Sequence, residues 1–273
     1  MTLNDENKLI IDTHVHIHSY PEEEIDEILE RAHSVGVGFV IDAGTTLETS
    51  SVSIELSSRH DRFFSGVGVH PMDIKDPLST EDCDVLQSMA SSNEKVIVMS
   101  EIGLDYLESS PDRALQFDAF RRQISIAREL SLPIVFHSRE AHEDCFRVLL
   151  EEKAYEVPGV MHYFQGTLDD AKRVIDLGYY VSIARPIFRL SHLADVVSQI
   201  SLDHIVVETD SSPQPFKNNR DNWTEPRHLR PIIEKIAELQ EKSVDEVEEK
   251  LFANTKKILS KRWDIVEKHI ASD

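Results

Sequence analysis

Two histidines spaced two residues apart begin the part of the chain that could do chemistry. They are His14 and His16 in the segment Asp12-Thr13-His14-Val15-His16, which directly follows the apolar run Leu9-Ile10-Ile11. Side chains two residues apart in a strand point to the same face, so both imidazoles would project together from the strand's end. Two converging imidazoles are the beginning of a metal site.

Four more residues of metal-binding type stand in the same kind of position, each at the end of a short apolar run. They are Glu101, His137, His162 and Asp210. With the first pair they provide four imidazoles and two carboxylates, more donors than one tetrahedral catalytic ion needs. The set predicts two divalent metal ions with open positions. Mixed imidazole and carboxylate ligands suit Zn or Mn, and Mg is the less natural choice.

The chemistry of the donors suggests a role for each. A carboxylate can bridge two ions, so Glu101 is the expected bridge, with the first two histidines on one ion and the last two on the other. Asp210 can bind with one oxygen and accept a proton from the attacking water with its other oxygen. Asp210 and Glu101 are therefore the candidate catalytic residues.

Eight short apolar runs are the predicted strands that must position these donors. They are Leu9–Thr13, Val37–Ala43, Phe63–Val69, Val96–Ser100, Pro133–Phe136, Gly159–His162, Tyr179–Ile183 and His204–Thr209. Helical spacing of apolar residues fills most gaps, as in Glu22–Ser34, Leu115–Leu130, Ala141–Glu152 and Leu168–Leu177.

Strands that alternate with helices indicate a parallel sheet. The number of strands and the length of 273 residues predict an α/β fold, a single TIM (β/α)8-barrel domain over residues 1–273. An open doubly wound sheet is the alternative, but its first strand usually leads into a Gly-rich phosphate loop. This chain has His14 and His16 there.

The C-terminal third is expected to contain one long loop and two closing helices. The loop, Ser211–Pro226, contains several prolines and is a plausible active-site loop. The helices are predicted over Pro226–Glu241 and Ser243–Arg262, with Ser243 and Glu246 forming a capping box. Gly36 and Gly178 are expected just past the ends of two earlier helices.

The composition limits the compartment and the partners. Fifty acidic residues against 29 basic ones give a net charge of −21, which argues against broad attraction to nucleic acid or anionic membranes. Bound cations can reverse that field locally, so a phosphate substrate is not excluded. There is no apolar stretch long enough for a membrane span and no signal peptide. The cysteines, Cys83 and Cys145, suggest no disulfide framework, so a cytoplasmic protein is expected.

Several segments together resemble the TatD-type deoxyribonucleases, metal-dependent hydrolases of the amidohydrolase superfamily. The segments are Asp12-Thr13-His14-Val15-His16, Gly68-Val69-His70-Pro71, Ser100-Glu101-Ile102-Gly103-Leu104-Asp105-Tyr106, Phe136-His137-Ser138-Arg139, Met161-His162-Tyr163-Phe164-Gln165-Gly166 and Glu208-Thr209-Asp210. The similarity runs from about Ile10 to Ile258. It implies a TIM barrel, a two-metal site and phosphodiester hydrolysis, often as a 3′→5′ exonuclease. By position it implies the metal ligands His14, His16, Glu101, His137, His162 and Asp210.

Residues around this set have expected supporting roles. His70 and Arg139 are expected to bind substrate, the arginine as a bidentate phosphate clamp. Asp105 and Glu208 are expected to support the ligand histidines. Further basic residues lie in or near the predicted rim loops, where solvated surface charge is the plain alternative: Arg185, Arg189, Lys217, Arg220 and Arg227.

The chain departs from the family pattern close to the site. Ile17-His18-Ser19-Tyr20 replaces the segment in which the family usually has an aspartate, and Ser211-Ser212-Pro213-Gln214-Pro215-Phe216 follows Asp210. DNA ends are the expected substrate. The alternatives are hydrolysis of a small phosphodiester, ester, amide or lactone on the same site and, less expected, a non-catalytic metal-binding scaffold.

Overall fold

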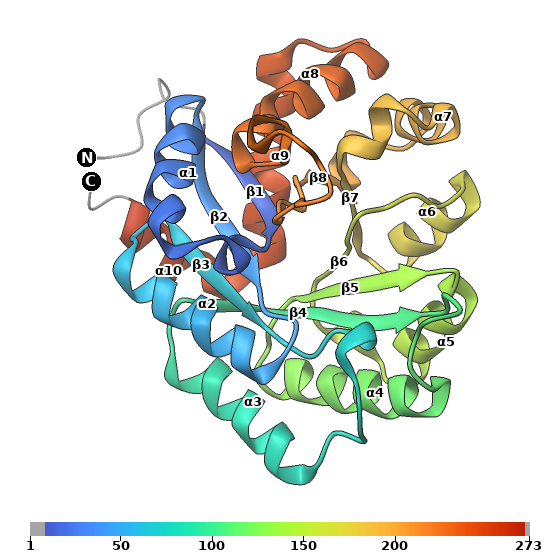
Figure 1. The fold of residues 1–273 in the computed structure, drawn as a ribbon. Helices are drawn as coiled ribbons and strands as arrows, with labels where there is room; N and C mark the ends of the chain where they lie inside the picture. Colours follow the sequence, from blue (N-terminus) through green and yellow to red (C-terminus); the bar gives the residue numbers. More distant parts are fainter. Residues whose placement is uncertain (1–8, 271–273) are drawn as a thin grey trace.

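Eight parallel strands form the centre of the computed structural model, which describes residues 9–270 (Figure 1). They are β1 (Ile10–Val15), β2 (Val37–Ala43), β3 (Phe63–Val67), β4 (Val96–Asp105), β5 (Ile134–Arg139), β6 (Gly159–Met161), β7 (Tyr180–Ile183) and β8 (Ile205–Val207). Each strand pairs with the next one in sequence, so the order is β1 to β8 without a crossover. This order excludes the doubly wound alternative.

Backbone contacts just beyond β8 bring the last strand back to the first. A parallel bridge joins Val15 to Ser211. The N–H of Asp210 donates to the carbonyl of His14 at 3.0 Å, and the N–H of His16 donates to the carbonyl of Ser211 at 2.8 Å. These contacts complete the predicted TIM barrel and connect the first and last segments of candidate donors.

Every predicted apolar run overlaps a strand, but β1 and β5 continue two and three residues further than predicted, and β4 continues furthest. The prediction ended it at Ser100, whereas the strand continues through Glu101 to Asp105. The pairing with β5 shifts register between Met99 and Ile102. Glu101 therefore lies within its strand and not at its end. The sequence does not indicate this continuation, because a polar pair such as Ser100-Glu101 normally marks the end of a buried strand. In the structure both side chains are buried inside the barrel's rim.

Helices connect the strands and surround the barrel. They are α1 (Glu22–Ser34), α2 (Leu47–Arg59), α3 (Thr80–Ser92), α4 (Arg113–Glu129), α5 (His142–Glu151), α6 (Leu168–Asp176), α7 (Ser191–Gln199), α8 (Leu229–Leu239), α9 (Val244–Leu259) and α10 (Trp263–Ile270). Short 3-10 helices are η1 (Ile17–Ser19), η2 (Pro71–Asp73), η3 (Ala154–Glu156), η4 (Arg185–Phe188), η5 (Leu202–His204), η6 (Arg220–Asn222), η7 (Pro226–His228) and η8 (Ser260–Arg262). None of the helices within residues 9–270 combines the length and apolarity of a membrane span.

The helix ends follow the local signals in most cases. Gly36 and Gly178 have φ angles of 92° and 78° just past α1 and α6, as expected for glycines after a helix. The hydroxyl of Ser243 accepts the N–H of Glu246, which is half of the predicted capping box. The last predicted helix was wrong in extent: α9 ends at Leu259, Ser260 takes a φ of 50°, and α10 follows.

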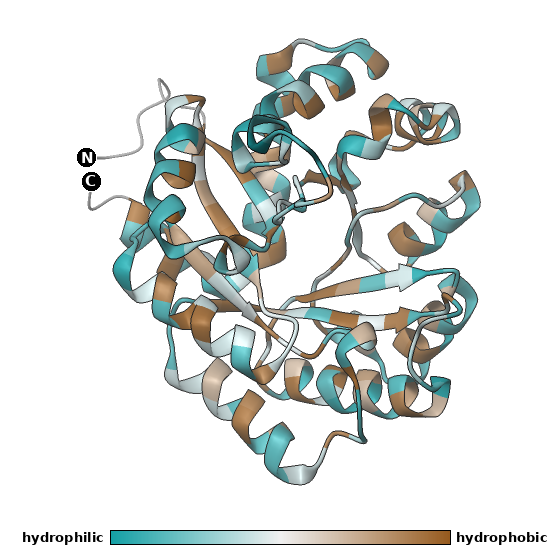
Figure 2. Ribbon diagram, in the orientation of Figure 1, coloured by the Kyte–Doolittle hydropathy of each residue, from teal (hydrophilic) through white to brown (hydrophobic). Residues whose placement is uncertain are grey.

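The apolar faces of strands and helices meet in the core, seen as brown segments in Figure 2. One buried cluster joins the early strand residues Phe39 and Phe64 to Trp263 and Val266 of α10. The ring centroids of Phe39 and Trp263 are 6.3 Å apart. Because α10 covers the beginnings of these strands, polar chemistry is left to the opposite, carboxyl-terminal rim.

Candidate metal centre

The carboxylate of Glu101 lies at the middle of the candidate site, and its two oxygens face different histidines. Glu101 is only 3% exposed. Its Oε2 lies 3.2 Å from Nε2 of His14 and 3.6 Å from Nε2 of His16. Its Oε1 lies 3.0 Å from Nδ1 of His137 and 2.9 Å from Nε2 of His162. The arrangement is that of a carboxylate between two donor sets.

Asp210 reaches this cluster from the segment after β8. Its Oδ1 lies 3.4 Å from Nε2 of His16, and donor atoms of Asp210, His14 and His162 lie within 4.8 Å of one another. Asp210 has a φ of 51°, a region that aspartate tolerates better than most residues. The structure thus brings all six donors predicted from the sequence to one place.

Hydrogen bonds to the far side of two histidines fix which ring nitrogen of the neutral imidazole, the form that binds a metal ion, faces the centre. Nδ1 of His16 donates to the carbonyl oxygen of Ala43 at 2.8 Å. Nε2 of His137 donates to Oδ2 of Asp105 at 2.9 Å. In each neutral ring the other nitrogen then carries a lone pair, and that lone pair faces carboxylate oxygens.

On His162 an ion-pair contact with a carboxylate takes the place of this hydrogen bond. Its Nδ1 lies 3.0 Å from Oε1 of Glu208, which favours a proton on Nδ1 and leaves Nε2 toward Glu101. Lone pairs and carboxylate oxygens at about 3 Å repel one another unless a proton or a cation lies between them. Histidines oriented in this way by carboxylates or carbonyls are typical of metal ligands, so the donor set fits divalent cations.

His70 differs from these histidines in its tautomer. Its Nε2 lies 3.3 Å from Oε1 of Glu101, and it can be grouped geometrically with Glu101 and His137. However, its Nδ1 accepts the N–H of Met72 at 3.1 Å. The neutral ring must then carry its proton on Nε2, so His70 presents a hydrogen-bond donor to the centre and no lone pair.

Two carboxylates support the ligand histidines from behind. Asp105 also accepts hydrogen bonds from the hydroxyl of Ser110 at 2.6 Å and from the guanidinium of Arg139 at 2.6 Å. Although burial opposes its charged form, these bonds and the one from His137 hold the pKa of Asp105 well below its usual range. Glu208, which is fully buried, accepts the N–H of Tyr163 at 2.7 Å. The side chain of Arg139, which is 46% exposed, contacts the buried carboxylate of Asp105.

The close approach of these groups shifts their pKa values. Burial alone would raise the pKa of Glu101, but His162 and His70 hold it well below its usual range. Burial lowers the pKa of His14, and nearby His162 lowers it further. Against the effect of burial, Asp210 raises the pKa of His16 to about 9. Also against the effect of burial, Asp105 raises the pKa of His137 and Glu101 raises that of His162. The metal-free cluster thus favours ionised carboxylates and protonated imidazoles at these three histidines, and a bound cation would replace their inward protons.

A buried hydrogen-bonded pair beside the cluster was not predicted from the sequence. Nδ1 of His18 lies 2.7 Å from Oδ2 of Asp42, and the rings of His18 and His16 are 5.8 Å apart. Both side chains are nearly inaccessible, and the pair lowers the pKa of Asp42 despite its burial. The available signal was one acidic residue, Asp42, inside the otherwise apolar run of β2.

The predicted active-site loop after Asp210 is fastened at both ends. The hydroxyl of Tyr20 lies 2.9 Å from the carbonyl oxygen of Ser212 and 2.6 Å from that of Thr224, so its one proton is shared between two acceptors. Glu225, 1% exposed, contacts three guanidinium groups at 2.9 to 3.1 Å. The guanidinium groups belong to Arg31, Arg220 and Arg227. The loop is therefore held against α1 by these contacts at both of its ends.

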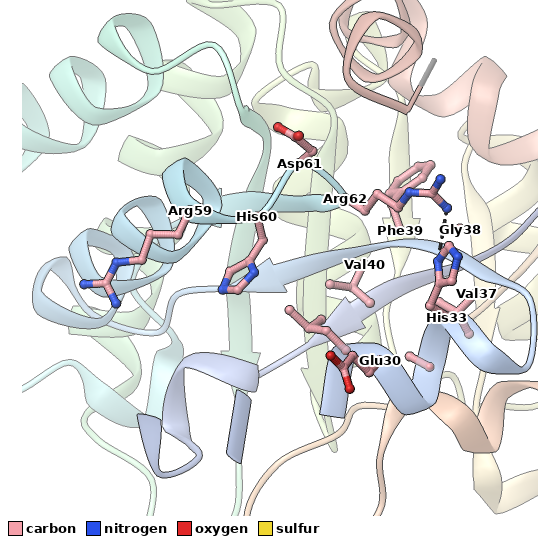
Figure 3. Close-up of a pocket in the computed structure, with 12 residues that line it drawn as sticks. Glu30, His33, Val37, Gly38, Phe39, Val40, Arg59, His60, Asp61 and Arg62 are labelled. Atoms are coloured by element: carbon pink, nitrogen blue, oxygen red, sulfur yellow. Dashed lines mark hydrogen bonds between the residues drawn. The ribbon is translucent and has the colours of Figure 1, made fainter. Parts of the chain in front are cut away.

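A pocket of about 350 Å³ lies elsewhere, between α1, the start of β2 and the turn after α2 (Figure 3). Its polar lining includes Glu30, His33, Arg59 and Arg62. His33 accepts a hydrogen bond from Arg62 at 3.1 Å through its Nδ1. None of the six donors lines this pocket, so it is separate from the candidate metal centre.

Comparison with known proteins agrees with the fold and shows the family. Residues 11–260 match the family described as TatD related DNase. The chain is 31% identical over 256 residues to the "Uncharacterized metal-dependent hydrolase YabD" of Bacillus subtilis, covering 92% of this chain and 98% of the relative. It is 28% identical to the "Deoxyribonuclease Tat-D" of Schizosaccharomyces pombe, with 88% of each chain covered.

Solved structures give the same result. The TatD homologue YjjV from Escherichia coli superimposes with a TM-score of 0.81 at 26% identity, covering 91% of this chain and 97% of the homologue. A TatD family hydrolase from Entamoeba histolytica has a TM-score of 0.82 at 22% identity, over 92% and 97% of the two chains. The second likeness concerns the fold alone.

Proposed function

Since the chain belongs to the family of TatD-related DNases, we propose that it is a metal-dependent hydrolase that cleaves phosphodiester bonds at the ends of DNA strands. The observation that carries this proposal is the carboxylate of Glu101, whose Oε2 faces His14 and His16 and whose Oε1 faces His137 and His162. A bridging carboxylate between two imidazole pairs suits a two-cation site. One relative of comparable length carries the name deoxyribonuclease.

We assign the metal ligands as His14, His16, Glu101, His137, His162 and Asp210, with two divalent ions of Zn, Mn or Mg. When bound, such ions supply a nucleophilic water at neutral pH and stabilise negative charge on phosphate oxygens. Asp210 accepts the proton of the attacking water with a carboxylate oxygen. Its Oδ1 is directed toward His16, which leaves Oδ2 for this step.

Two further residues act on the substrate in this proposal. His70 donates from Nε2 to a phosphate oxygen, because its Nδ1 already accepts from Met72. Arg139 lies against Asp105 but is 46% exposed, so its guanidinium can contact a phosphate while it supports Asp105. Asp105 and Glu208 hold the rings of His137 and His162 in the required tautomer.

The test compares substrates on one metal-loaded preparation. Single-stranded and duplex oligonucleotides labelled at the 3′ or the 5′ end are incubated beside a small aryl ester and a lactone. Stepwise shortening from the 3′ end that chelation stops supports the proposal. Turnover of the ester or lactone with intact oligonucleotides would favour the small-molecule alternative, and binding of metal without any turnover would favour the scaffold.

A further inference from the structure

The rim loops after β6, β7 and β8 carry an unusual combination of exposed aromatic and cationic residues. Of the eleven phenylalanines in the sequence, only two are exposed in the described chain: Phe188 in η4, at 52%, and Phe216 in the loop after β8, at 78%. Each is followed directly by a cation, Arg189 or Lys217. Single exposed apolar side chains are common on protein surfaces, but these two aromatic rings lie after neighbouring strands, β7 and β8, and each is next to a cation.

The cations of this surface lack carboxylate partners. Arg185 donates to the hydroxyl of Thr224 at 3.0 Å, Arg189 donates to the amide oxygen of Gln165 at 3.4 Å, and Lys217 donates to the carbonyl of Asn222 at 2.8 Å. Within residues 9–270, none of these three cations forms an ion pair with a carboxylate. Most other arginines described are paired with one, as expected for a chain of net charge −21.

The three loops form one continuous surface that reaches the candidate metal centre. β6, β7 and β8 are neighbours in the sheet, and Arg185 connects the β7 loop to the β8 loop through Thr224. Gln165, which accepts the hydrogen bond from Arg189, is three residues from His162, and Phe216 is six residues from Asp210, so two of these loops begin at proposed ligands. Burial and the neighbouring Arg185 lower the pKa of Lys217.

Resting on the proposed function, we propose that Phe188, Phe216, Arg185, Arg189 and Lys217 form a platform that positions the unpaired end of a polynucleotide beside Asp210. The two rings stack on bases, and the three cations contact successive phosphates. Aromatic side chains interleaved with a cationic groove are the usual means of binding single strands without sequence preference. A small ester or lactone would use neither feature.

The anchoring of the loop makes this platform a positioning device. Tyr20 and Glu225 fasten both ends of the segment that carries Phe216. Phe216 is thus presented on a held loop, so less ordering is needed when a base stacks on it. These residues position the strand and take no part in the chemical step.

The test measures binding and turnover of an oligothymidylate by Phe188→Ala, Phe216→Ala and the double variant. Each single change should weaken binding, measured by fluorescence anisotropy, and raise KM at least about fivefold, with kcat little changed. Phe216→Trp should restore binding. Tyr155→Ala is the matched control, because Tyr155 is 50% exposed in η3, which precedes β6 and so lies at the opposite end of the barrel, where the strands begin.

An oligonucleotide with abasic sites near its end separates stacking from general damage. Its affinity for the wild-type protein should equal the affinity of the intact strand for the double variant. The affinity of the abasic strand should not fall further in the double variant. Lys217→Met or Arg189→Met should reduce the dependence of log Kd on log salt by about one unit. Arg147→Met, a change in α5 at an arginine paired with Asp144, should leave that slope unchanged.

The outcomes distinguish this inference from the proposed function. If the double variant binds and shortens intact and abasic strands as the wild type does, the platform is wrong while the nuclease activity stands. If neither protein hydrolyses oligonucleotides or bis(p-nitrophenyl) phosphate, the proposed function fails first. Tighter binding of blunt duplex than of single strands, unaffected by the phenylalanine changes, would also overturn the platform.

Discussion

Nε2 of His70 lies 3.3 Å from Oε1 of Glu101, and in the neutral ring it points a proton at the same oxygen toward which neutral His137 and His162 would direct lone pairs. The difference arises from the far side of the ring, where the N–H of Met72 occupies Nδ1 of His70. One oxygen therefore has two kinds of imidazole neighbour. Distances alone would group all of them as metal ligands, whereas the tautomers separate His70 from the others.

His70→Ala should therefore lower activity without removing metal. We expect the variant to bind the same number of ions as the wild type, measured by elemental analysis after gel filtration. Its KM for a phosphodiester should rise, because a donor to the phosphate is lost. Loss of an ion from His70→Ala would show that the ring is a ligand and that its tautomer is reversed.

Metal removal should abolish activity, and Mn, Mg or Zn should restore it, because six convergent donors leave the chemistry dependent on cations. Elemental analysis of the reconstituted protein should find up to two ions per chain. Full activity after exhaustive dialysis against a chelator, with no residual metal detected, would contradict the assignment.

Glu101→Ala should cost about 10²-fold or more in turnover, the scale seen when groups that support a metal site are removed. The change deletes both oxygens that the two histidine sets share. His33→Ala is the matched control, because His33 lies away from the donors, in the separate pocket. Near-normal turnover and metal content in Glu101→Ala would exclude the bridging role.

Asp210→Asn keeps the shape and one oxygen donor but loses the basic carboxylate. We expect this variant to retain at least one ion and to bind substrate, while turnover falls by about 10²–10⁴-fold, the usual contribution of a general base. The acidic limb of the pH–rate profile should shift or disappear. A variant that binds and turns over normally would make Asp210 structural and Glu101 the next candidate for the proton acceptor.

The raised pKa of His16 predicts how the metal-free protein depends on pH. Its pKa is about 9 in the fold, against an ordinary value of 6.5. The folded state therefore holds the proton more tightly, and the pair with Asp210 stabilises the metal-free protein fully below about pH 6.5. This contribution is lost as the pH rises through 9.

Urea denaturation of the metal-free protein at several pH values measures this effect, with His16→Gln as the comparison. Over pH 6.5 to 9 the wild type should lose more stability than the variant. Mn affinity of the wild type should rise over the same interval, because binding must displace the proton. Parallel pH profiles for the two proteins would show that His16 does not carry the effect.

The strands and the six donors were predictable because both depend on local patterns. Short β-branched runs predict buried parallel strands, and a polar residue ending each run predicts the catalytic rim. The continuation of β4 past Glu101 was not predictable in this way, because a carboxylate inside a strand normally indicates its end. Here histidines from other strands surround that carboxylate, and no local pattern shows them.

Two other features needed information that the sequence lacks. The pair of His18 and Asp42 depends on how β1 and β2 align, which local periodicity does not give. The tautomer of His70 depends on the backbone of η2. In contrast, the sequence does contain a helical apolar pattern for α10, in Trp263, Val266 and Ile270. The prediction ends the last helix at Arg262 and does not include this pattern.

The contacts between β1 and the segment after β8 determine when the proposed metal ligands can come together during synthesis. His14 and His16 are synthesised early, but Asp210 follows only after all eight strands have been made. Since domains acquire structure from the N-terminus onward during synthesis, these histidines remain without Asp210, their partner almost two hundred residues later in the sequence, until the barrel is nearly complete. A chain arrested before β8 would have most of a barrel but an incomplete set of donors.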